Sequence, residues 1–127
     1  MLFYSFESQE QRRAAGGSAF IEIQYCRYPA GTPIGELVDC VTHWQNDSLY
    51  VADADAFYRE YGGIFTGGVY GNRKRGTVDL WGINYYEPTL TRAILERLYE
   101  QMPDDFATLT AWLIRAKEYN GFYVLGM

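Results

Sequence analysis

The sequence contains few of the residues from which disulfide scaffolds, metal sites and imidazole-based active sites are built. Its 127 residues include two cysteines, Cys26 and Cys40, and one histidine, His43. Two cysteines favour a reduced cytoplasmic protein over a disulfide scaffold. Cys40 and His43 lie three residues apart, and Asp39 or Cys26 could join them, but a metal site takes three or four tightly spaced ligands. The alternative interpretation is a Cys and a His that flank a buried stripe.

Catalytic and nucleotide-binding motifs are also absent from the sequence. No Ser lies in a G-x-S-x-G turn, and any general-base role for an imidazole would fall to His43. The two glycines of the segment Gly71–Gly76 resemble those of a phosphate-binding loop. No Lys follows the second glycine, however, and the segment leads into a predicted strand instead of a helix. We therefore expect no metal, no cofactor and no enzymatic activity.

Positive charge and long apolar runs are scarce as well. Lys and Arg number 11 against 16 Asp and Glu, which gives a formal net charge of −5. This balance argues against binding to nucleic acid phosphates, and it favours either solubility alone or association with a basic partner. No apolar run is long enough to span a membrane, and Met1–Phe6 lacks the basic segment that begins a signal peptide. We expect a cytoplasmic protein with neither a nucleic-acid nor a membrane partner.

Aromatic residues, in contrast, are abundant. They make up 17% of the chain, with 12 Tyr and 3 Trp. Tyr and Trp give large contact areas with few torsions to freeze, so they suit buried cores and protein interfaces equally well. The chain length predicts one domain that covers residues 1–127 and buries most of its unfolded surface.

Hydrophobic periodicity predicts an α+β fold with a mostly antiparallel sheet of about five strands and four helices, in the order β-β-α-α-β-β-α-α-β. In the second predicted strand, Ile21, Ile23 and Tyr25 alternate with Glu22 and Gln24, which predicts one buried and one solvated face. The predicted strands are Leu2–Phe6, Ala19–Arg27, Ile64–Tyr70, Thr77–Tyr86 and Phe122–Leu125. The predicted helices are Pro33–Trp44, Ala54–Tyr61 and two within Pro88–Tyr119. Pro103 separates the last two helices, and Asp104 is the expected N-cap of the final one.

A polar turn joins the third and fourth predicted strands and carries three consecutive cations. Arg73, Lys74 and Arg75 form the tip of this predicted hairpin. The tip could contact a phosphate backbone or an acidic partner, or it could simply be solvated.

The acidic segment Asp47–Tyr61, which includes the second predicted helix, is interleaved with aromatic residues. Carboxylates beside aromatic rings are typical of a surface that binds a basic protein, since the charges steer the partner and the rings anchor it. The same residues are explained equally well as a capped surface helix, with Asp53 as the cap. The candidate partner-binding residues are Asp47, Tyr50, Asp53, Asp55, Tyr58, Glu60, Arg73, Lys74 and Arg75.

Two segments of the C-terminal half resemble a known family. Gly76–Tyr86 (GTVDLWGINYY) and Glu118–Gly126 (EYNGFYVLG) are similar to segments of small immunity proteins from bacterial polymorphic-toxin systems. The resemblance implies a cytoplasmic, non-enzymatic protein that binds a cognate toxin, a nuclease or another intracellular effector, and covers its active site. The resemblance assigns no catalytic residue to this chain. The alternative hypothesis is a small regulatory or ligand-binding module in which Trp81 and Tyr85 form an apolar pocket on the sheet.

Overall fold

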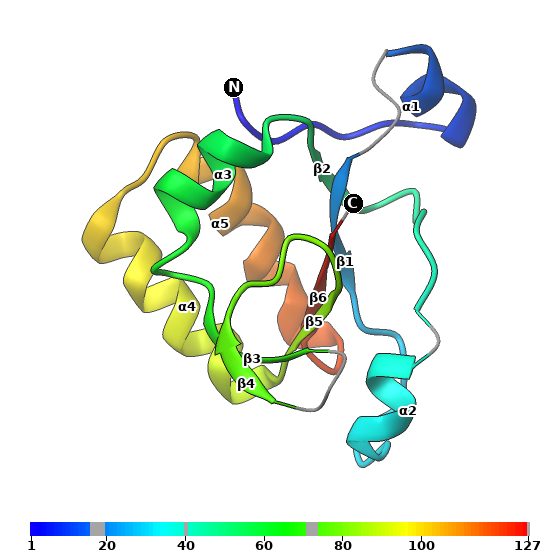
Figure 1. Ribbon diagram of the computed structural model, residues 1–127, viewed down its shortest axis with the longest axis vertical. Helices are drawn as coiled ribbons and strands as arrows, with labels where there is room; N and C mark the ends of the chain where they lie inside the picture. The colour runs from blue at the N-terminus through cyan, green and yellow to red at the C-terminus, as the bar shows by residue number, and fades with distance from the viewer. Residues whose placement is uncertain (16–19, 40, 71–73, 127) are drawn as a thin grey trace.

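The fold is α+β, with one six-stranded antiparallel sheet and helices on both of its faces (Figure 1). The computed structural model describes residues 1–15, 20–39, 41–70 and 74–126. The predicted class is therefore confirmed, with six strands and five α-helices in the described residues instead of five strands and four helices. The strands are β1 (Ile21–Tyr25), β2 (Leu49–Val51), β3 (Thr66–Tyr70), β4 (Arg75–Thr77), β5 (Ile83–Tyr86) and β6 (Phe122–Leu125).

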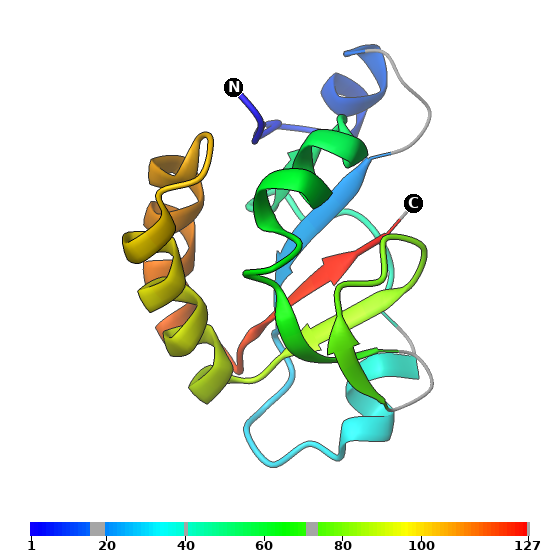
Figure 2. The same ribbon diagram turned by 60° about the vertical axis from the view of Figure 1, so that its left-hand side comes forward.

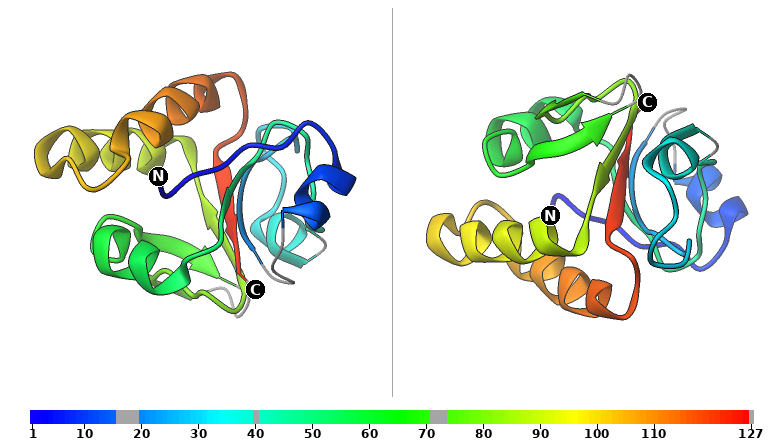
Figure 3. Two further views of the ribbon diagram at one scale, coloured as in Figure 1. Left: turned by 90° about the horizontal axis from the view of Figure 1, so that it is seen from above. Right: turned by 90° about the horizontal axis from the view of Figure 1, so that it is seen from below.

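Seen along the sheet, the helices divide into two layers. Figure 3 places α3, α4 and α5 on one face and α1 and α2 on the other. The longest helices, α4 and α5, form an antiparallel pair beside the sheet (Figure 2). The helices are α1 (Gln9–Ala14), α2 (Ile34–Asp39), α3 (Ala54–Tyr61), α4 (Pro88–Gln101) and α5 (Phe106–Arg115), and a 3₁₀ turn, η1 (Ala116–Glu118), follows α5.

The C-terminal strand holds the two halves of the sheet together. The strand order is β2-β1-β6-β5-β3-β4, so β6 lies between the N-terminal strands and the strands from the middle of the chain. It pairs Val124 with Ile23 of β1 on one side and with Asn84 of β5 on the other. The chain enters β6 through Gly121, whose φ of +82° is accessible to glycine with little strain.

The larger core lies between the sheet and the helices α3, α4 and α5. Ile21, Ile23 and Tyr25 of β1 all face it, as their alternation predicts. The ring of Tyr25 stacks on Trp112 of α5 with 3.9 Å between the centroids, and its hydroxyl donates to the Trp112 carbonyl oxygen at 2.7 Å. Burial raises the pKa of Tyr25, so the phenol stays neutral at ordinary pH.

A smaller core covers the opposite face of the sheet, where the sequence predicted solvent. Glu22 is completely buried and Gln24 is 4% exposed, so the prediction of a solvated face on this strand is wrong. The segment 41–48 and α2 lie over this face, and Leu37 and Val38 of α2 pack there beside Tyr123 of β6. Polar residues in a strand predict solvent only when no distant segment supplies their hydrogen-bond partners.

The first predicted strand and the first predicted helix differ from the structure. In Leu2–Phe6 only Tyr4 pairs, through one bridge to Tyr50, and it is β2 that pairs with β1 at this edge of the sheet. The predicted helix Pro33–Trp44 forms only α2, because the residues from 41 onward are irregular and Trp44 has a φ of 90°. Neither α1 nor β2 was predicted. Ala19, at the start of the predicted second strand, and Cys40, in the predicted helix, lie outside the described residues.

The elements predicted from Ala54 onward agree more closely with the structure, with two exceptions. α3 and β6 have the predicted bounds, and Asp53 caps α3 by accepting from the Ala56 N–H at 3.0 Å. The predicted strand Thr77–Tyr86 is wrong in its middle, because residues 78–82 form a turn between β4 and β5. The predicted cap Asp104 is also wrong, since Asp105 is the residue that precedes α5.

Candidate functional site

The buried carboxylate of Glu22 positions the segment that covers the second face. Its Oε1 accepts from the Trp44 N–H at 2.5 Å, and its Oε2 accepts from the Gln45 N–H at 3.0 Å and the Ser48 hydroxyl at 2.7 Å. The Gln24 side chain adds a fourth donor at 3.0 Å. Four hydrogen bonds replace the water that burial removes, so this carboxylate shapes the segment 41–48 into a loop.

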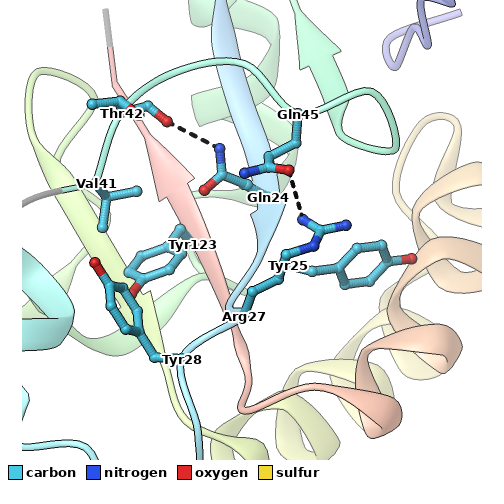
Figure 4. Close-up of a pocket in the computed structure, with 8 residues that line it drawn as sticks. All are labelled: Gln24, Tyr25, Arg27, Tyr28, Val41, Thr42, Gln45 and Tyr123. Atoms are coloured by element: carbon cyan, nitrogen blue, oxygen red, sulfur yellow. Dashed lines mark hydrogen bonds between the residues drawn. The ribbon is translucent and has the colours of Figure 1, made fainter.

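A cavity of about 230 Å³ lies between this loop and the sheet (Figure 4). Gln24 and Tyr123 reach it from the strands β1 and β6, and Tyr28 lies at its outer side, 37% exposed. The Tyr123 ring is buried, and its hydroxyl donates to the Leu37 carbonyl oxygen at 2.7 Å. The residues that line the cavity are Gln24, Tyr25, Arg27, Tyr28, Val41, Thr42, Gln45 and Tyr123.

The two glutamine side chains of this cavity have fixed orientations. Gln24 Nε2 donates to Glu22 Oε2 and to the Thr42 carbonyl oxygen, which are both acceptors only. Gln45 Oε1 accepts from Arg27 Nη1 at 3.0 Å, and the other guanidinium nitrogen of Arg27 pairs with Asp47. Among the described residues, no hydrogen bond to another residue uses Gln24 Oε1 or Gln45 Nε2.

A second site forms at the turn between β4 and β5. Asp79 Oδ1 accepts from the Trp81 N–H at 3.0 Å, and the Asp79 N–H donates to the side-chain oxygen of Asn84 at 2.7 Å. These bonds close the turn and break the strand that the alternation predicted. The indole of Trp81 is left 77% exposed at its tip. Tryptophan is enriched among the anchors of protein–protein interfaces, so this turn is a candidate interaction site.

The structure brings Trp81 together with part of the predicted acidic segment. A hollow of about 680 Å³ lies between the start of α3 and the turn. Asp53 and Asp55 are exposed on its α3 side, and Leu80 and Trp81 line the other. We refer to Asp53, Asp55, Leu80 and Trp81 as the Trp81 surface. Sequence reasoning selected both carboxylates but placed Trp81 in a sheet pocket, although the turn residues Asp79 and Gly82 signal the break.

The other predicted partner-binding residues of the acidic segment are dispersed. Tyr50 is completely buried beneath the Trp44 ring, so the structure excludes it from an exposed surface. Asp47 pairs with Arg27, just past the end of β1, and the Glu60 carboxylate accepts from the Asp104 N–H at 3.1 Å. Tyr58 is 49% exposed on α3.

The predicted cationic tip is only partly described. Arg73 lies outside the described residues, and Lys74 is exposed. The Arg75 guanidinium donates two hydrogen bonds to the Glu87 carboxylate, at 2.8 and 3.0 Å, and one to the Gly67 carbonyl oxygen. The hydrogen bonds to Glu87 raise the pKa of the Arg75 guanidinium. Arg75 thus ties β4 to the start of α4.

The remaining sequence candidates do not converge. His43 Nε2 lies 2.9 Å from the Gly126 carbonyl oxygen, and Cys26 is buried with its sulfur 3.5 Å from the Tyr123 hydroxyl. Within residues 1–15, 20–39, 41–70 and 74–126 no three His, Cys, Asp or Glu side chains are grouped so that they could hold a metal ion. In the same part of the chain no helix has the length and apolar character needed to cross a membrane.

Comparisons with protein-family models, with curated proteins and with solved structures found no match for this chain. We therefore infer function from the residues and geometry of the chain itself.

Proposed function

We propose that this chain is a non-enzymatic binding protein, an immunity protein that neutralises a cognate bacterial toxin by covering its active site. The observation that carries the proposal is the exposed indole of Trp81 beside the carboxylates of Asp53 and Asp55. Tryptophan is among the residues that contribute most to protein–protein affinity when a partner buries it. The neighbouring carboxylates suit a partner whose facing surface is basic.

The overall charge supports the same partner chemistry. At a net charge of −5 the chain attracts a basic protein over a distance and repels an acidic one. If the toxin is a nuclease, its substrate groove is basic, and Asp53 and Asp55 occupy positions that phosphates take in the substrate. The resemblance of Gly76–Tyr86 to immunity proteins includes Trp81 itself.

The proposal is tested by co-expression with the toxin domain that we expect the adjacent gene to encode. The wild-type chain should restore growth of cells that produce this domain, and Trp81→Ala should not. Tyr99→Ala is the matched control, because Tyr99 is also exposed, on α4, and lies outside the Trp81 surface. Growth restored equally by Trp81→Ala, or no protection by the wild type, would contradict the proposal.

A second candidate is a small regulatory or ligand-binding module. The pocket first expected for it does not form, because Trp81 is exposed whereas Tyr85 is buried under α2 with its hydroxyl bonded to the Asn120 carbonyl oxygen. The cavity beside Gln24 and Tyr123 supports this candidate instead. A thermal shift with a small-molecule panel, in the absence of any protein partner, distinguishes it from the first proposal.

A further inference from the structure

A groove of about 420 Å³ lies between the first two turns of α4 on one side and the end of α5 with η1 on the other. These segments are neighbours because α4 and α5 run antiparallel (Figure 2). The volume lies within the range of roughly 300–1,000 Å³ that is common for small-molecule sites. We refer to this site as the α4–η1 groove. Its apolar lining consists of Pro88, Leu95, Leu113, Ile114 and Ala116.

The polar lining of the α4–η1 groove consists of one hydroxyl and two cations. The Thr91 hydroxyl is already used, because it donates to the Glu87 carbonyl oxygen at 3.0 Å. Arg92 of α4 and Lys117 of η1 line the groove from different elements, and both are exposed. None of the described residues that line the groove is acidic. A ligand in this groove therefore meets apolar side chains and positive charge.

The side chains of Arg92 and Lys117 have no partner of their own. Within the part of the chain that the structure describes, neither side chain makes a hydrogen bond or an ion pair. Glu96, one turn after Arg92, and Glu118, next to Lys117, are exposed and do not line the groove. These carboxylates reduce the positive potential without occupying either cation. An anion that enters the groove therefore gains contacts with both cations and displaces no existing partner.

We propose that the α4–η1 groove binds a free aliphatic carboxylate of medium chain length. The chain lies against Leu95 and Ile114, and the carboxylate lies between Arg92 and Lys117. Both parts of the ligand contribute, because a neutral chain makes no use of the cations and a small anion leaves the apolar lining in water. The groove shares no residue with the Trp81 surface, so this inference is independent of the proposed toxin binding.

The test is an NMR titration of the whole chain with octanoate near neutral pH, followed through the methyl signals of Leu95 and Ile114. Octanoate should bind with a Kd on the order of 1 mM, as expected for a ligand of about ten non-hydrogen atoms. Hexanoate should bind about five- to tenfold more weakly, because two fewer methylene groups leave water. Octylammonium and 1,2-octanediol keep the chain and change the head group, so each should bind at least about threefold more weakly than octanoate.

Removal of the two cations tests the contact with the carboxylate. Arg92→Gln with Lys117→Gln should weaken octanoate binding about three- to tenfold, since each exposed ion pair contributes little by itself. The same double variant should bind 1,2-octanediol as the wild type does, whereas a distorted groove would bind both ligands more weakly. Arg13→Gln with Arg59→Gln is the matched control. It removes the same charge from exposed positions on α1 and α3 and should change octanoate binding little.

Ile114→Asn tests the contact with the aliphatic chain. It should weaken the binding of octanoate and of 1,2-octanediol alike, about threefold or more, because it removes apolar lining. Ile34→Asn is the matched control, since Ile34 is 43% exposed on α2, against 44% for Ile114, and lies outside the groove. No shift of the Leu95 and Ile114 signals with octanoate, equally tight binding of 1,2-octanediol, or unchanged octanoate binding in the double variant of Arg92 and Lys117 would overturn the proposal.

Discussion

Glu22 determines how the second face of the sheet is covered. Its carboxylate accepts backbone N–H groups from Trp44 and Gln45, which would be hydrogen-bonded within a helix if the predicted helix continued. The loop geometry, including the left-handed φ of Trp44, follows from this capture. The sequence did not predict it, because a Glu in an alternating strand usually faces solvent and its donors lie some 20 residues away.

We predict that Glu22→Gln lowers the free energy of unfolding by about 2 kcal/mol or more. The introduced amide nitrogen would face N–H and O–H donors and leave buried groups unsatisfied. Urea denaturation of the variant measures this loss. Glu36→Gln is the matched control at an exposed position on α2 and should change the free energy little. Equal stability of Glu22→Gln and the wild type would contradict the role given to Glu22.

Asp105 ties the start of the chain to α5. Its Oδ2 accepts from the N–H groups of Leu2 at 3.0 Å and Phe3 at 2.9 Å, and its Oδ1 accepts from the Thr108 hydroxyl. Burial acts to raise the pKa of this carboxyl, but these hydrogen bonds and the terminal amine outweigh it and lower the pKa below its ordinary value of 3.8. The ionised form therefore stabilises the fold above pH 3.8, and this contribution is lost as the pH falls through the lowered pKa.

We expect Asp105→Asn to remove this part of the acid dependence. The difference in unfolding free energy between wild type and variant should be constant near neutral pH and shrink below about pH 4. Asn also tolerates the left-handed backbone of position 105, where φ is 59°. Denaturant titrations at several pH values measure the difference, with Asp104→Asn as control. A difference that does not change with pH would show that ionisation of Asp105 contributes nothing.

At the scale of elements, the parts that the sequence predicted are those with local signals. α3 has an Asp cap, α4 has Pro88 in its first turn, and β6 follows Asn120-Gly121. The elements that differ depend on distant partners or on competing turn bonds. α2 ends early because of Glu22, and the predicted strand after Thr77 breaks because Asp79 and Asn84 bond to each other. Local patterns carry no information about such partners.

The same reasoning applies to the candidate sites. The carboxylates of Asp53 and Asp55 were identified from composition, but the exposure of Trp81 depends on the turn that presents it. Gln24 of β1 and Gln45 of the loop 41–48 line one cavity on the second face of the sheet. No spacing rule connects those two residues, so only the fold reveals this site.

We predict that Gly121→Ala destabilises the protein at the junction between η1 and β6. A Cβ at this position would lie 2.1 Å from the Tyr86 carbonyl oxygen, and φ is +82°. The left-handed backbone and the clash together should lower the free energy of unfolding by about 3 kcal/mol. Two control variants separate these causes. Gly31→Ala has a φ of +91° and nothing within 4 Å, and Gly63→Ala has open space without a positive φ. Similar stabilities for all three variants would refute the explanation.

At the scale of the whole molecule, the two candidate sites lie on different sides of the sheet. The α3 side carries the Trp81 surface, which is the proposed docking site for a basic protein, and the α2 side carries the small cavity beside Gln24 and Tyr123. The central strand β6 joins both, because it pairs with strands from each half of the sheet. Variants of the Trp81 surface therefore leave the residues that line this cavity unchanged.

We predict that Asp53→Asn with Asp55→Asn slows association with the partner about two- to tenfold at low salt, with little change in dissociation. Asn preserves the helix cap that Asp53 provides. Stopped-flow or surface-binding kinetics across a salt series measure the effect. Glu96→Gln with Glu100→Gln removes the same charge from exposed positions on α4 and should have a smaller effect. Association rates that do not depend on salt would contradict a role for these two carboxylates in binding the partner.

The measurement that tests the central claim most directly is capture of the toxin from native cells by tagged wild-type, Trp81→Ala and Tyr99→Ala chains. The account predicts one basic partner, enriched with wild type and Tyr99→Ala and released by high salt. Loss of the indole should weaken its binding about thirtyfold or more, so Trp81→Ala should recover little of it. Equal recovery by Trp81→Ala, or no partner in cells that express the neighbouring gene, would contradict a toxin-binding role centred on Trp81.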